Sequence, residues 1–94
     1  MDRQAFIDKM AAKLKQWDAE IEKLEAKAEE KEADARMEYD KKIEKLQNKK
    51  EEAQKKLDEV KNASEEAWGE LKAGAEKALG NLKNSFDDAI NKFK

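Results

Sequence analysis

The chain has 94 residues, of which 47% are Asp, Glu, Lys or Arg, about twice the charged fraction of an ordinary soluble domain. Lys and Arg number 21 and Asp and Glu number 23, so the net charge is −2. The two signs are mixed along the whole chain, which leaves neither a basic nucleic-acid footprint nor an acidic tail. This composition disfavours a compact globule and indicates one small helical domain over residues 1–94.

Several kinds of chemistry are excluded by residue types that the chain lacks. With no Cys and no His, it has no disulfide, no thiolate or imidazole metal ligand, and no cysteine or histidine catalysis. Adjacent carboxylates such as Glu51 and Glu52 point about 100° apart on a helix, so they do not converge on one proton or metal ion. The three glycines are scattered rather than gathered in a phosphate-binding loop. We therefore expect no enzyme activity, no cofactor and no metal.

The hydropathy of the chain bears on its location. The amino-terminal residues carry charges where a secretory signal peptide needs a continuous apolar segment. No window approaches the run of about 18 apolar residues typical of a membrane-spanning helix. We therefore expect a cytoplasmic protein.

Residues 5–61 have the composition of one long helix. They contain no Gly, Pro, Ser or Thr, and their only β-branched members are Ile7, Ile21, Ile43 and Val60. Most of the others are strong helix formers, so the summed propensity favours one uninterrupted helix. At 1.5 Å per residue that helix would be roughly 85 Å long. We predict an all-α, elongated, coiled-coil-like fold whose first element is a long helix over about residues 5–61.

The first part of this predicted helix carries a heptad seam. Large apolar residues recur there at alternating steps of three and four, which places them on one helix face. The seam weakens after Ala28 and an apolar strip resumes at Tyr39, a pattern that we interpret as a stutter within one helix. Either a coiled-coil partner or a short helical bundle would bury such a seam. The first seam consists of Ile7, Met10, Leu14, Trp17, Ile21 and Leu24.

Residues 62–66 contain the first candidate break. Asn62 and Glu65 have the spacing of a capping box, and Ser64 is a second possible cap, although Asn and Ser also occur inside helices. Beyond this point the apolar residues follow an 11-residue period, which keeps their stripe nearly parallel to a straight helix axis. We predict a shorter amphipathic helix over about residues 65–93. Its seam consists of Trp68, Leu71, Leu82, Phe86, Ile90 and Phe93.

Both seams predict partners for this chain. A long helix and a shorter one would bury too little apolar surface to offset the conformational entropy of ordering them. We therefore expect the two seams to be self-association surfaces and the protein to be a dimer or a tetramer. An antiparallel second copy would cover the amino-terminal half of each long helix, while a parallel arrangement stays open. The sequence identifies no client protein.

Other interpretations stay open beside this one. Residues 65–94 could lie on a membrane surface through their apolar face, with Lys72, Lys83 and Lys92 near its edges. Their acidic residues weaken attraction to an anionic leaflet, and the same face could instead pack on the long helix. High charge and low hydropathy also fit a partly disordered protectant that gains helix on crowding or drying. Nucleic-acid binding is not expected, because the lysines are interleaved with carboxylates.

Three segments carry a resemblance to known proteins, the strongest part of which is the two tryptophans in their contexts. The segments are Trp17, Ile21 and Leu24-Glu25-Ala26-Lys27-Ala28, then Glu52-Ala53-Gln54-Lys55-Lys56-Leu57, then Ala67-Trp68-Gly69-Glu70-Leu71-Lys72-Ala73-Gly74. Together they resemble a family of small bacterial coiled-coil proteins, often described as stress-response proteins, over most of the chain. The resemblance implies a soluble helical protein without enzyme activity, similar in composition to apolipoprotein-like and desiccation-associated helices. It supplies no catalytic or binding residues, and from it we expect a stress-related role.

Overall fold

The computed structural model describes residues 2–93, and the side chains of residues 2–91. Three helices make up most of it, α1 (Arg3–Glu29), α2 (Ala33–Asn62) and α3 (Trp68–Phe93). Residues 2–93 contain no strand, and the domain measures 51 × 19 × 16 Å along its principal axes. The all-α, elongated fold predicted from the sequence is therefore confirmed.

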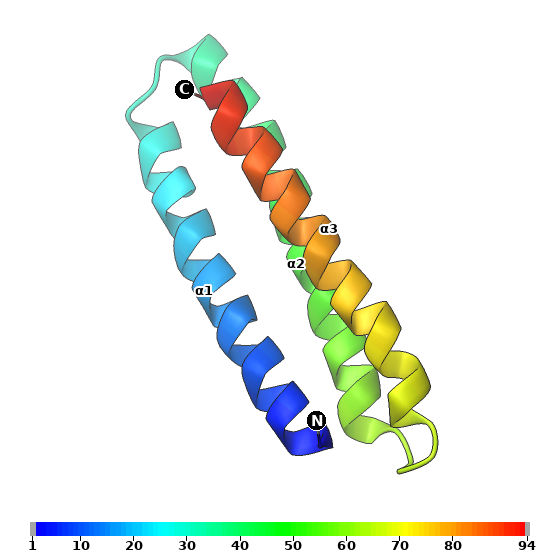
Figure 1. The fold of residues 1–94 in the computed structure, drawn as a ribbon. Coiled ribbons are helices and arrows are strands. Elements are labelled where there is room, and N and C mark those ends of the chain that lie inside the picture. Colours follow the sequence, from blue (N-terminus) through cyan, green and yellow to red (C-terminus); the bar gives the residue numbers. More distant parts are fainter. Residues whose placement is uncertain (1, 94) are drawn as a thin grey trace.

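The single long helix predicted over residues 5–61 is wrong, because the chain reverses direction at residues 30–32 and α2 runs antiparallel to α1 (Figure 1). The first helix ends where the Glu30 N–H donates to the carbonyl of Lys27 at 3.1 Å. Glu32, which precedes α2, has an extended backbone (φ −69°, ψ 162°) and makes no side-chain cap. Helix propensity at these few residues is outweighed by the apolar surface that the reversal buries between α1 and α2.

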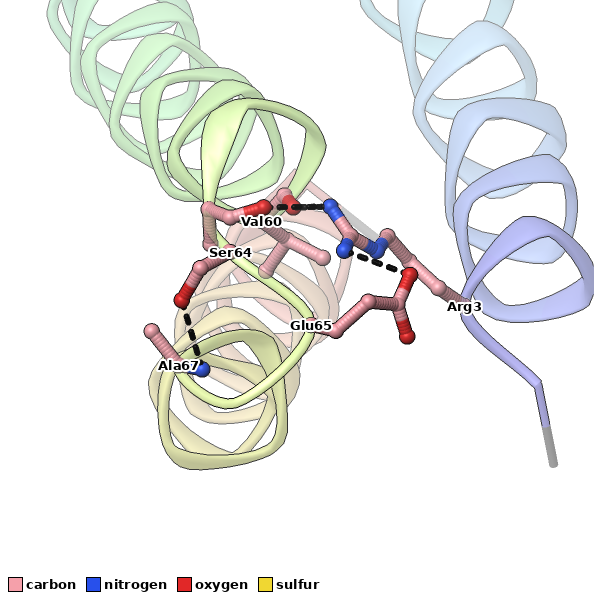
Figure 2. Close-up of polar contacts among 6 residues, drawn as sticks. Arg3, Val60, Ser64, Glu65 and Ala67 are labelled. Carbon is pink, nitrogen blue, oxygen red and sulfur yellow. Dashed lines mark hydrogen bonds and ion pairs between the residues drawn. The ribbon is translucent and has the colours of Figure 1, made fainter.

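The break predicted within residues 62–66 is confirmed, although α3 begins at Trp68 rather than near residue 65. Of the two caps considered, Ser64 is the one that forms. Its hydroxyl oxygen accepts a hydrogen bond from the backbone N–H of Ala67 at 3.1 Å (Figure 2). The capping box is absent, since Glu65 pairs with Arg3 at 2.9 Å and Asn62 makes no side-chain hydrogen bond within the described residues.

All three helices share one hydrophobic core, and α2 packs extensively along both of the others. Its neighbours α1 and α3 run parallel to each other, with few close backbone approaches between them (Figure 1). The largest fully buried side chains are Leu46, Leu57, Val60 and Leu82. Burying a side chain of this size is worth about 1.5–3 kcal/mol relative to exposure. The core therefore lies mainly on the two faces of α2, and the α1–α3 side is left more open.

Arg3 ties the first turn of α1 to the end of α2 (Figure 2). Its guanidinium donates to the carbonyl oxygens of Ala63 at 2.5 Å and Val60 at 3.5 Å, and forms the ion pair with Glu65. Carbonyls at a helix carboxyl end lack intrahelical partners and carry partial negative charge, so a cation placed there stabilises them. This contact fixes the amino-terminal end of α1 beside the α2–α3 turn, and thereby sets where α1 lies relative to α3.

Candidate functional site

Both seams predicted from the sequence meet in the core of a single chain. The buried members are Ile7, Met10, Leu14, Ile21, Leu24, Leu82 and Phe86, and the half-buried members are Trp17, Trp68, Leu71 and Ile90. The side chain of Phe93 lies outside those that the structure describes. Burial of these residues does not require a second copy, because α1 is covered by α2 of its own chain. An antiparallel second copy was expected because half of a long helix would be uncovered, and the structure has no such uncovered half. The role of the seams in self-association stays a prediction.

Two aromatic pairs connect α1 with α3. The rings of Phe6 and Trp68 lie 6.5 Å apart between centroids, and those of Trp17 and Phe86 lie 4.9 Å apart, with tilted planes in both cases. Tilted aromatic pairs at such distances are worth about 0.5–1.5 kcal/mol each beyond the area that they bury. The two parallel helices are thus joined through large side chains rather than through close backbone packing.

A groove of about 520 Å³ lies between α1 and α3. Its apolar lining comes from Phe6, Met10, Trp17, Leu79 and Gly80. Its polar lining comes from Lys9, Lys13, Gln16, Lys72, Glu76 and Lys83. The volume falls within the range of about 300–1,000 Å³ that is usual for small-molecule sites. Apolar walls with a few polar groups are also typical of such sites. We take this α1–α3 groove as the candidate site.

The charge of the α1–α3 groove differs in sign from that of the whole chain. Four lysines and one glutamate line it, whereas the chain carries a net charge of −2. Lys72 contacts Glu76 at 3.8 Å and Lys83 contacts Asp87 at 3.2 Å, so each has an acidic neighbour. Lys9 and Lys13 make no ion pair or hydrogen bond with any other described residue. The positive charge of the groove is therefore least neutralised along its α1 edge.

A second hollow, of about 310 Å³, lies between α1 and α2 and has the opposite charge. Its charged lining consists of Glu25, Glu29, Asp40 and Glu44 together with Arg36. Among the residues that the structure describes, no group of three or more acidic side chains is arranged to hold a metal ion. The apolar part of this hollow is limited to Ala28 and Ile43, so it lacks the hydrophobic walls of the α1–α3 groove.

Sequence reasoning found one side of the α1–α3 groove and missed the other. It placed Lys72 and Lys83 at the edges of the apolar face of the last helix, and both line the groove. It assigned no role to Lys9 and Lys13, which follow Phe6 on the flank of the first seam. A signal was present in their spacing of four residues, which puts two lysines on one edge of that seam. They line a groove only because α3 lies opposite them, and helical periodicity alone does not indicate where α3 lies.

Comparison with protein-family models, with curated proteins and with solved structures finds no match to this chain. Its membership of the coiled-coil family that the sequence resembles thus stays a prediction. Within residues 2–93, no helix is both long and apolar enough to cross a membrane.

Proposed function

We propose that this chain is a non-enzymatic helical interaction protein that binds its partner in the α1–α3 groove. The observation that carries the proposal is the groove itself, in which aromatic and aliphatic side chains at the edge of the core lie beside the side chains of four lysines. Such a surface binds by apolar contact and charge, because the lysine stems extend its apolar walls while their ammonium groups stay in water.

The anionic, apolar dye anilinonaphthalene sulfonate tests this proposal directly. We expect the folded protein to enhance the fluorescence of the dye, and a leucine in place of Gly80, which lines the groove, to reduce that enhancement severalfold. The matched control is Gly74→Leu, which alters the same helix outside the groove lining. An enhancement that is absent from the parent protein, or unaffected by Gly80→Leu, would contradict binding at the groove.

The proposal includes the self-association predicted from the sequence, as a dimer or a tetramer. The units that associate would be complete three-helix domains. Two α1–α3 grooves facing each other would bring eight lysines together against two glutamates, which opposes symmetric pairing through that face. Among the side chains that the structure describes, Met37 on α2 is the large apolar one that is exposed, at 59%. We therefore place the self-contact on α2 and expect Met37→Lys to reduce the mass measured by light scattering. The same mass for the parent and the variant would contradict that placement.

The proposed stress-related role is supported by the resemblance in sequence. Deleting the gene in its host should reduce survival under drying or osmotic stress, and restoring it should recover survival. Equal survival of the deletion strain would remove this part of the proposal.

Peripheral membrane binding through α3 and protection by a partly disordered chain are the alternatives, and both have less support. The apolar face of α3 packs on α2, where Ala75, Leu82 and Ala89 are at most 1% exposed, so membrane insertion would require α3 to leave the core. The continuous core supports an ordered chain in dilute solution. A cooperative thermal transition by circular dichroism would count against the disordered protectant, and its absence would favour it.

A further inference from the structure

We propose that two copies of this chain exchange α1, by straightening of the α1–α2 turn, and so form an antiparallel dimer. In this exchanged dimer, residues 3–62 of each chain form one continuous helix, and α1 of each chain packs on α2 and α3 of the other. The inference goes beyond the proposed function, because exchange requires neither a partner in the α1–α3 groove nor the self-contact at Met37. Three features lead to it: the geometry of the turn, the alignment of the two core faces and the register of α1 against α2.

The α1–α2 turn is close to helical in both sequence and backbone geometry. Residues 30–32 are Glu, Lys and Glu, which are good helix formers, and no residue among those described has a positive φ. Glu30 is helical (φ −81°, ψ −9°). Glu32 has a helical φ of −69° and an extended ψ of 162°, and it makes no side-chain cap. A change of ψ at Glu32 would make it helical, and the first N–H groups of α2 would then donate to the carbonyls of residues 29–31.

The α2–α3 turn has specific contacts that keep it closed. The Ser64 hydroxyl oxygen accepts a hydrogen bond from the Ala67 N–H at 3.1 Å, and the Ala63 carbonyl accepts one from Arg3 (Figure 2). In the exchanged dimer, Arg3 of the second copy would make this contact. The third helix therefore stays on α2 of its own chain, and α1 is the element that moves.

A continuous helix would keep the core faces of α1 and α2 on the same side. Ala28 is the last buried residue of α1 and Tyr39 is the first of α2. They are 11 residues apart, which is three helical turns to within about 20°. In one isolated chain both faces would be uncovered, so the chain reverses to bury them. A second copy would cover them with the same side chains, and the balance between the two forms then depends on the turn and on protein concentration.

The register of α1 against α2 fixes where two such helices would cross. Three contacts across this pair of helices define the register: Asp18–Lys50 at 2.6 Å, Glu25–Gln47 at 3.0 Å, and Lys31–Tyr39 at 5.6 Å from the ammonium nitrogen to the ring centroid. The residue numbers of these pairs add up to 68, 72 and 70, so residues whose numbers total about 70 lie opposite each other. With this register kept, Ala35 lies opposite Ala35 of the second copy. A small residue at the crossing allows the two helices to approach closely.

The charges around this crossing also suit a second copy. At about 100° per residue, Lys31 and Glu38 lie on one flank of Ala35, and Glu32 and Arg36 lie on the other. The two-fold symmetry of an antiparallel pair brings equivalent flanks together. Lys31 would therefore meet Glu38 of the second copy, and Arg36 would meet its Glu32. All four residues are exposed in the closed chain, and opposite charges on both flanks favour this register over a shifted one.

Cross-linking between chains detects the exchange directly, because the protein contains no cysteine of its own. One preparation carries Glu25→Cys and another carries Gln47→Cys, at positions whose side chains contact each other in the closed chain. The two are unfolded together in urea, refolded at high protein concentration and treated with a short bismaleimide. Exchange brings position 25 of one chain beside position 47 of the other, so we expect a cross-linked dimer that contains both variants.

The control for chance collisions is Glu25→Cys refolded alone. In the exchanged dimer, the two positions 25 lie about 20 residues apart along the bundle, which is roughly 30 Å. We therefore expect at least about tenfold less cross-linked dimer from this preparation. Small-angle scattering of the dimer fraction should also show a particle at least about 90 Å long, the length of a continuous helix over residues 3–62, compared with 51 Å for the closed domain.

A proline at position 33 distinguishes the exchanged dimer from the closed chain. Ala33 is the first residue of α2, and Glu32 before it is extended, which is the context that proline favours. In the continuous helix position 33 is internal, where proline removes a hydrogen bond and clashes with the preceding turn. Ala33→Pro should keep the circular dichroism spectrum and Tm of the closed chain and reduce the cross-linked dimer at least about tenfold. Ala33→Gly keeps the N–H and should reduce it less.

The remaining outcomes separate the exchange from the proposed function. If the mixed preparation gives no more cross-linked dimer than Glu25→Cys alone, or if Ala33→Pro leaves the yield unchanged, the exchange is overturned. A dimer that Ala33→Pro keeps and Met37→Lys removes would also overturn it, in favour of closed domains that associate through α2. Dye binding is expected in both forms, because exchange rebuilds each α1–α3 groove from two chains, so its loss would contradict the proposed function alone.

Discussion

Replacing Arg3 by alanine should destabilise the domain far more than removing Glu65, although the two side chains form an ion pair. Arg3 is 19% exposed and its guanidinium contacts two carbonyl oxygens at the end of α2, while the side chain of Glu65 is 85% exposed. A hydrogen bond from a charged donor is worth about 1.5–3 kcal/mol, and an exposed ion pair is worth about 0.2–1 kcal/mol. After allowance for partial exposure, we expect Arg3→Ala to cost about 2 kcal/mol and Glu65→Ala to cost at most about 0.5 kcal/mol.

Thermal unfolding followed by circular dichroism measures this difference. For a domain of this size, each 1 kcal/mol shifts Tm by about 4–8 °C, so Arg3→Ala should lower Tm by about 8–16 °C and Glu65→Ala by no more than about 2–4 °C. The double variant should lie close to Arg3→Ala, with a coupling energy of about 0.5 kcal/mol or less in the double-mutant cycle. If the two single variants cost the same and the coupling energy accounts for that cost, the ion pair, rather than the contact with the α2 carbonyls, holds α1 in place.

Three further sets of substitutions probe the core, the α1–α2 turn and the Ser64 cap. Leu82→Asp places a charge at a site with 0% exposure and should cost more than about 4 kcal/mol, while Ala35→Asp at an exposed position of α2 should change stability by less than about 0.5 kcal/mol. Leu14→Asp should act like Leu82→Asp, and we expect both to reduce the oligomer mass in light scattering. Glu30→Gly in the α1–α2 turn should be nearly neutral in urea unfolding, whereas Glu51→Gly inside α2 should cost about 1 kcal/mol; equal costs would indicate a continuous helix. Ser64→Ala should lower stability by about 1 kcal/mol through loss of the hydrogen bond to Ala67, and an unchanged Tm would show that the cap contributes nothing.

The sequence predicted helix content well because propensity and periodicity are local properties. Asp2, for example, caps α1 through a hydrogen bond from the Ala5 N–H at 2.7 Å, as expected for a short carboxylate beside free amides of a first turn. The second break was predictable because Ser64 is a strong capping residue. These features need no knowledge of what lies opposite each helix.

The first turn could not be predicted in the same way, because residues 30–32 contain no Gly, Pro, Asn or Ser. The available signal was the interval between Ala28 and Tyr39, where the apolar strip has no large residue in register. A stutter and a reversal both produce such an interval. The reversal is favoured over the stutter by the free energy of packing the strip at Tyr39, Ile43 and Leu46 against the first seam. That free energy comes from tertiary contacts, which local sequence patterns do not contain.

The openness of the α1–α3 groove follows from which side chains face each pair of helices. Towards α2, the third helix presents alanines at Ala75, Ala78 and Ala89, all buried, and small residues allow two helices to approach closely. Between α1 and α3 stand the bulky pairs Phe6–Trp68 and Trp17–Phe86. Large rings at these points keep the two backbones apart, because interhelical distance depends on the size of the side chains at the contact. The alanines that hold α3 against α2 and the aromatic rings that separate it from α1 therefore create the groove together, so its presence is determined by the core that stabilises the fold.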